Sequence, residues 1–167
     1  MTATIEELAE KDLEEAAEVS RECLHDAWER WEKDYYPREA LEYDLTQHSA
    51  EEYEKFLKLP RSFFFVAKEK GRIVGLALGR IIGKTGLANL GWICVAPKSR
   101  RRGIGDSILE RLEEYARSEG CHKIFLNTLP CLTDAVRLYF KRGWIPECNL
   151  KRHWWKVDFI VMSKWFD

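Results

Sequence analysis

A short run of arginines and glycines, Arg100–Asp106, is the part of the sequence best suited to bind an anion. It reads RRRGIGD and stands between an apolar run that ends at Val95 and an amphipathic segment. At the start of a helix the backbone N–H groups have no internal partners and carry partial positive charge. Glycines let a ligand approach these groups, and arginine forks suit phosphate oxygens. The run therefore predicts a phosphate site, with a solvated charge run as the alternative.

The surroundings of this run favour the phosphate site over the solvated run. It follows a predicted strand within a strand–helix–strand crossover, and open α/β sheets bind ligands at that edge. It has neither the lysine and hydroxyl residue of a nucleoside-triphosphate loop nor the spacing of a dinucleotide fingerprint. A different phosphate-containing ligand is therefore expected.

The N-terminal third is predicted to be helical and acidic. Asp12 is expected to cap a helix from Leu13 to about Trp31, because apolar residues recur there at three- and four-residue spacing. The Tyr35-Tyr36-Pro37 sequence breaks that helix. A second amphipathic region covers residues 37–58 in two pieces that divide around residues 46–50, and a short edge strand is expected at residues 2–5.

The rest of the chain reads as strands with two helices inserted. Three strands with short turns form a meander, and the segment 87–128 is a crossover that sets two strands parallel. The sequence therefore predicts one domain over residues 1–167, an α/β fold with a mixed, mostly antiparallel sheet, a central parallel strand pair and helices on both faces. The expected strands are 62–68, 73–82, 87–95, 124–126, 144–148 and 155–164, and the expected helices are 104–119 and 134–142.

Composition restricts the class of protein. The net charge of −1 argues against a nucleic-acid binder, and no apolar run approaches the roughly 20 residues of a membrane span. The first ten residues lack the basic and apolar regions of a signal peptide. Five scattered cysteines without a C-x-x-C pair indicate free thiols in a reducing cytoplasm, and the four histidines lack metal-ligand spacing.

Two spaced motifs resemble the GNAT superfamily of acyl-CoA N-acyltransferases. The central motif of that family is Arg or Gln, two residues, Gly, one residue, then Gly or Ala, after a Val-x-Pro. Its later signature is Ala-x-x-Leu-Tyr before a glycine–aromatic pair. The first maps onto Val95, Pro97, Arg100, Gly103 and Gly105, and the second onto Ala135, Leu138, Tyr139, Gly143 and Trp144.

The resemblance implies an enzyme that transfers an acetyl group from acetyl-CoA to a primary amine by direct attack. Backbone groups at the end of the central strand would bind the pantetheine arm, and the arginine–glycine run would hold the pyrophosphate. Tyr139 would protonate the leaving thiolate; a packed helix residue is the alternative for it. The implied coenzyme-binding residues are Ile93, Cys94, Val95, Arg100, Arg101, Arg102, Gly103, Ile104, Gly105 and Asp106.

The sequence also departs from the family pattern. Leu132 stands where an asparagine often binds the coenzyme, so Thr133 or Asn127 would have to replace it. The strand 87–95 contains no carboxylate, and Asn127 occupies a position where some relatives have a catalytic glutamate. An amide cannot accept the proton, so the general base is left open between ordered water and an amine that arrives neutral.

Two other classes of function remain as alternatives. One is a coenzyme-binding or regulatory module with this fold and no transfer activity, which Leu132 and the missing base favour. The other is an interaction protein whose aromatic C-terminus forms a permanent interface, such as a homodimer. Residues 151–155 could line the acceptor pocket, form a subunit contact or form a solvated turn. The acidic face of residues 6–54 could attract a cationic amine or be an ordinary solvated helix surface.

Overall fold

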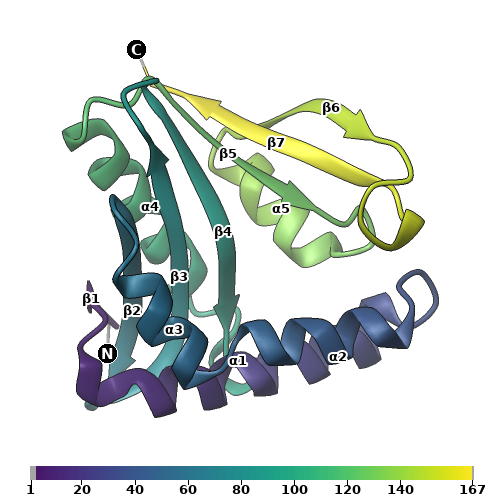
Figure 1. The fold of residues 1–167 in the computed structure, drawn as a ribbon, viewed down its shortest axis with the longest axis horizontal. Helices are drawn as coiled ribbons and strands as arrows, with labels where there is room; N and C mark the ends of the chain where they lie inside the picture. The colour runs from purple at the N-terminus through teal and green to yellow at the C-terminus, as the bar shows by residue number, and fades with distance from the viewer. Residues whose placement is uncertain (1–2, 167) are drawn as a thin grey trace.

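A single seven-stranded sheet runs through the molecule in the order β1-β2-β3-β4-β5-β7-β6 (Figure 1). The structure is a computed structural model that describes residues 3–166. Only β4 and β5 are parallel, and every other neighbouring pair is antiparallel, as predicted. The strands are β1 (Thr4–Glu7), β2 (Ser62–Glu69), β3 (Arg72–Ile82), β4 (Leu87–Val95), β5 (Lys123–Thr128), β6 (Ile145–Leu150) and β7 (Phe159–Trp165).

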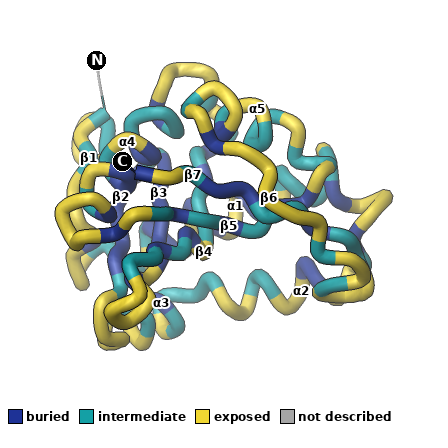
Figure 2. Tube along the Cα trace, turned by 90° about the horizontal axis from the view of Figure 1, so that it is seen from above, coloured by how far each residue is buried: buried dark blue, intermediate teal, exposed yellow. Residues whose placement is uncertain are grey.

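Helices cover both faces of the sheet because successive strand residues point to opposite sides. Phe63 and Phe65 of β2 pack in the cluster that contains α4, whereas Phe64 and Val66 pack in the cluster that contains α1 and Tyr53. The buried segments of the trace accordingly lie in the strands and on the inner helix faces (Figure 2). The helices are α1 (Leu13–Ala27), α2 (Arg38–Gln47), α3 (Ala50–Leu57), α4 (Ile104–Ser118) and α5 (Thr133–Lys141).

The two parallel strands separate after a short paired stretch. Residues Leu87, Ala88 and Asn89 of β4 face the first three residues of β5, and no pairing continues beyond them. From there β4 pairs only with β3, and the end of β5 pairs only with β7. Figure 1 shows the strands diverging toward α1, with α5 beside the opening. The backbone at the end of β4 therefore has no strand on its β5 side.

Three local predictions need correction. Asp12 does not cap α1, because its carboxylate accepts a hydrogen bond from Lys68 at 2.8 Å. The α-helix ends at Ala27 and continues as the π-helical turn Trp28–Glu32. Strand β1 begins at Thr4; the first predicted strand residue, Thr2, lies outside the described residues.

The last strand begins later than predicted. Trp155 has a φ of 57° and lies in a short turn, so β7 begins at Phe159. The carboxylate of Asp158 closes this turn by accepting hydrogen bonds from the Lys151 side chain at 2.7 Å and the Arg152 backbone at 2.8 Å. This closure of the turn overrides the apolar pattern that suggested a longer strand.

Candidate active site

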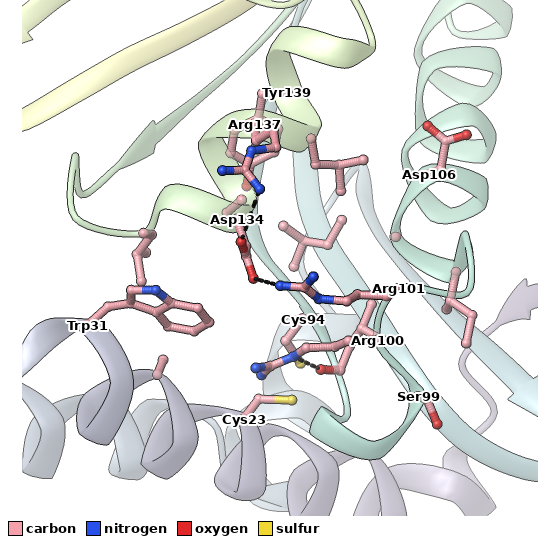
Figure 3. A pocket seen from close by; sticks show the side chains of 18 of the residues that line it. Cys23, Trp31, Cys94, Ser99, Arg100, Arg101, Asp106, Asp134, Arg137 and Tyr139 are labelled. Carbon is pink, nitrogen blue, oxygen red and sulfur yellow. Dashed lines mark hydrogen bonds and ion pairs between the residues drawn. The ribbon is translucent and has the colours of Figure 1, made fainter.

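One cavity of about 480 Å³ lies where β4 and β5 separate (Figure 3). Its walls come from the end of β4, the start of α4, the helix α5 and the last turns of α1. The arginine–glycine run and Tyr139 therefore share one space, although they are far apart in sequence. The residues named in advance that line it are Ile93, Cys94, Val95, Arg100, Arg101, Gly103, Ile104, Gly105, Asp106 and Tyr139.

The start of α4 presents its free backbone N–H groups to this cavity. Gly103 is the residue before the helix and has a φ of 81°, which favours glycine, and no side chain caps the helix. The first helical hydrogen bond from this turn is donated by the Ser107 amide to the Gly103 carbonyl at 3.0 Å. A Cβ atom on Gly105 would lie 3.0 Å from Leu138 of α5. The glycines thus hold a narrow, amide-lined opening suited to an anion.

The three arginines have different surroundings. The Arg100 guanidinium donates to the Val95 carbonyl at 2.9 Å and pairs with Asp26 of α1. Arg101 is largely exposed, and its only ion pair among residues 3–166, with Asp134, is long at 3.7 Å. Arg102 does not line the cavity, because its guanidinium pairs with Glu69 at 2.8 Å. Arg101 is therefore the arginine whose side chain is most available to a phosphate.

Tyr139 is buried in the wall that α5 contributes. It is 4% exposed and packs against Trp144 with ring centroids 5.7 Å apart. Within the described part of the chain its hydroxyl has no hydrogen-bond partner in the protein, and burial raises the pKa of the phenol above its ordinary value. The hydroxyl therefore stays protonated and can donate to a ligand in the cavity.

The end of β4 supplies backbone groups and a buried thiol. Ile93 and Val95 pair with Ala77 and Gly75 of β3 on one side only. Burial raises the pKa of the Cys94 thiol, and the neighbouring Cys23 thiol raises it further (Figure 3). Cys94 is consequently a neutral thiol and not a thiolate nucleophile.

The comparisons with known proteins agree with this geometry. The model of the acetyltransferase (GNAT) family matches residues 24–144, which is more than half of the chain. The chain belongs to the GNAT family. The resemblance inferred from the two motifs is thereby confirmed, and acetyl-CoA is the acyl donor that this family uses.

Solved structures share the fold of this GNAT chain. PaiA N-acetyltransferase from Thermoplasma acidophilum, in complex with coenzyme A, has 22% identity and a TM-score of 0.83, with 99% of this chain and 100% of that one covered. Ribosomal-protein-S18-alanine N-acetyltransferase from Escherichia coli has 21% identity and a TM-score of 0.69, with 96% and 92% covered. At these identities the likeness supports the fold alone.

The GNAT cavity also contains residues that sequence analysis missed. Trp31 and Glu32, at the end of the π-helical turn, line it from the α1 side, and Cys23 lies beside Cys94. Glu32 follows Trp28 by four residues and therefore shares the apolar helix face. The four-residue spacing from Trp28 indicates that Glu32 faces inward, but Glu32 is one of many acidic residues in this segment and does not stand out from them.

The aromatic segment near the C-terminus does not line this cavity. Trp154 and Trp155 are 57% and 42% exposed, and Trp155 contacts Tyr43 of α2 edge to face with centroids 6.0 Å apart. The segment is thus a turn that packs against α2, and a turn is one of the three alternatives expected. Among residues 3–166, no helix is both long and apolar enough to cross a membrane.

Proposed function

We propose that this chain is an N-acetyltransferase that moves the acetyl group of acetyl-CoA to a primary amine by direct attack, with the whole chain acting as one domain. The observation that supports this most is the shared cavity: the start of α4, the one-sided end of β4 and Tyr139 all border it. Membership of the GNAT family supports acyl transfer in general.

The amides at the start of α4 and the Arg101 side chain would bind the pyrophosphate of the coenzyme. A phosphate there would accept several backbone hydrogen bonds at once and meet the positive end of a 15-residue helix. The unpaired side of Ile93–Val95 would offer backbone groups to the pantetheine arm and to the thioester carbonyl. Asp106 would act through its backbone amide, because its carboxylate pairs with Arg142 at 3.3 Å.

Tyr139 would act as the general acid. As the amine nitrogen bonds to the thioester carbon, the carbon–sulfur bond breaks and the thiolate takes the Tyr139 proton, while the proton lost by the amine restores the phenol through water. With ordinary pKa values of about 10 for a phenol and about 8.5 for a thiol, this transfer is uphill by about 1.5 pKa units, so the departing sulfur must lie within hydrogen-bond reach of the hydroxyl. Burial raises the pKa of Tyr139 further, which keeps the phenol protonated until the thiolate forms and makes a direct hydrogen bond to the sulfur necessary for the transfer.

Replacing Tyr139 with phenylalanine tests this role. The Tyr139→Phe variant is expected to lower turnover about 100-fold, the range for one general acid, while acetyl-CoA affinity stays within about twofold. Thiol release with a panel of amines gives turnover, and calorimetry gives affinity. Tyr115→Phe is the matched control, because Tyr115 packs against Phe63 and Phe65 and does not line the cavity.

Two outcomes would contradict the proposal. Equal turnover in Tyr139→Phe would remove this residue from catalysis. Acetyl-CoA binding without thiol release for every amine would instead support the coenzyme-binding or regulatory module.

A further inference from the structure

A buried carboxylate without a partner lies at the α1 end of the cavity. Glu32 is 9% exposed and lines the cavity, yet within residues 3–166 its carboxylate has neither an ion pair within 4.0 Å nor a hydrogen bond. Among the described residues, only the Trp92 indole nitrogen is a side-chain polar atom that lacks both solvent contact and a hydrogen-bond partner. The Glu32 carboxylate is therefore not sealed from solvent, and the residue lines the cavity.

The groups around Glu32 make its charge costly. Asp44 of α2 is the second carboxylate nearby, and Tyr36 and Cys131 lie close enough for the charge of Glu32 to act on them. Burial raises the pKa of Glu32 to about 7, helped by Asp44, and burial raises that of Asp44 to about 6. Desolvated carboxylates are normally paired, so this pair is unusual for a purely structural element.

The cations of the cavity are already paired with other acids. Arg100 is held by Asp26 of α1. Arg101 lies on the loop before α4, and Arg137 and Lys141 lie on α5. None of them is within ion-pair distance of Glu32 in the described chain. The other pairs are Arg101 with Asp134 at 3.7 Å, Arg137 with Asp134 at 3.9 Å and Lys141 with Asp106 at 3.8 Å.

A positively charged ligand would satisfy this end of the cavity. Glu32 closes a π-helical turn, a feature that is frequent at functional sites, and it shares the cavity with Tyr139. We propose that Glu32, supported by Asp44, binds the acceptor as a cationic primary amine and takes one of its protons. This assignment rests on the proposed acetyl transfer and supplies the base that the strand 87–95 lacks.

The proton balance of the reaction is complete with these two residues. The ammonium gives one proton to the Glu32 carboxylate, directly or through one water, and the freed nitrogen attacks the thioester carbon. The second nitrogen proton replaces the one that Tyr139 gives to the departing sulfur. The product is an amide with one N–H, a free thiol and a protonated Glu32, which then loses its proton to solvent. A pKa near 7 suits a base at neutral pH better than the ordinary value of about 4.5.

The Glu32→Gln variant tests the assignment with butylamine, diaminobutane and glycinamide as probes. At about pH 7 it is expected to lower kcat/KM for the best of these amines about 100-fold, while acetyl-CoA affinity by calorimetry stays within about twofold. The loss should shrink toward the ordinary amine pKa of about 10, where the amine arrives neutral. Glu29→Gln is the control, because Glu29 lies on the same turn, is exposed and pairs with Lys33 at 3.2 Å.

Asp44→Asn provides a second measurement that leaves Glu32 in place. Removing the negative charge of Asp44 is expected to move the rise of kcat/KM with pH to lower pH, because Asp44 raises the pKa of Glu32. A kcat/KM for Glu32→Gln within about threefold of the wild type, an equal loss at every pH, or an unmoved midpoint in Asp44→Asn would each overturn the assignment. A wild-type protein that binds acetyl-CoA and acetylates none of the amines would overturn the proposed transfer itself, and this role of Glu32 with it.

Discussion

Glu113 and Glu32 are both buried glutamates, but their surroundings are opposite. Glu113 of α4 is 2% exposed and accepts hydrogen bonds from Arg142 at 2.9 and 3.1 Å, from Lys164 at 2.7 Å and from the Trp144 indole at 2.9 Å. Glu32 is 9% exposed and has Asp44 as its charged neighbour. Burial raises the pKa of both carboxylates, and only their hydrogen-bond and charge partners differ.

The pKa of each group records this difference. Burial alone would raise the pKa of Glu113, but the hydrogen bonds from Arg142, Lys164 and Trp144 outweigh it and lower the value. With no such donors, the pKa of Glu32 rises to about 7. A buried carboxylate that is fully satisfied connects α4 to α5 and β7, whereas one left unsatisfied at a cavity is suited to a ligand.

The largest expected effect follows from breaking the Glu113 network. Glu113→Gln is expected to lower the free energy of unfolding by about 3 kcal/mol, because the partly buried Lys164 loses its counter-charge and Arg142 keeps only Asp106. Urea denaturation measures this change. Glu110→Gln, an exposed position on the same helix, should stay within about 0.5 kcal/mol of the wild type. Equal stability in the two variants would show that the network does not hold α5 and β7 to α4.

Glu32→Gln is expected to change stability in the opposite direction. The folded pKa of Glu32 is about 7 against an ordinary 4.5, so its contribution to stability is complete below 4.5 and is lost as the pH rises through 7. The neutral glutamine avoids this loss, and the variant should therefore gain about 2 kcal/mol over the wild type near pH 8 and little near pH 4. Thermal unfolding across this range checks it; a constant difference would mean that Glu32 does not titrate as described.

The smallest expected effect comes from removing one of the three donors to Glu113. Lys164→Met leaves Arg142 and the Trp144 indole in place, so the loss should be about 1.5 kcal/mol, the low end of the range for one hydrogen bond to a charged group. Urea denaturation of this variant and of Glu113→Gln gives the share of the network's stabilisation that comes from Lys164. A loss equal to that of Glu113→Gln would show that the network fails as a unit.

Much of the fold could be predicted from local sequence patterns. The strand Leu87–Val95 was predicted with the bounds that the structure shows, and the crossover set β4 and β5 parallel. Alternating or helical periodicity and glycine turns act over a few residues, so they are visible in the chain itself. The predictions for Asp12 and Trp155 were wrong because Lys68, 56 residues away, and the turn closed by Asp158 outweigh local preference.

The site was only partly predictable for the same reason. Ten of the eleven residues named in advance border the cavity, and Arg102 does not, because the end of β2 places Glu69 beside it. Three adjacent arginines are alike in sequence and become different only when other elements pack around them. Glu32 was not named at all, because the lack of an ion pair to it among residues 3–166 is a property of the packed helices.

The amino-acid sequence by itself determined the elements, their order and the arginine–glycine start of α4, since these depend on the chemistry of neighbouring residues. Only the tertiary structure decided where β4 and β5 separate, that Tyr139 borders the same cavity as Arg101, and that Glu32 is buried without a counter-charge. Burial and charge pairing join residues that are distant along the chain, and they shift a pKa only after the chain has folded.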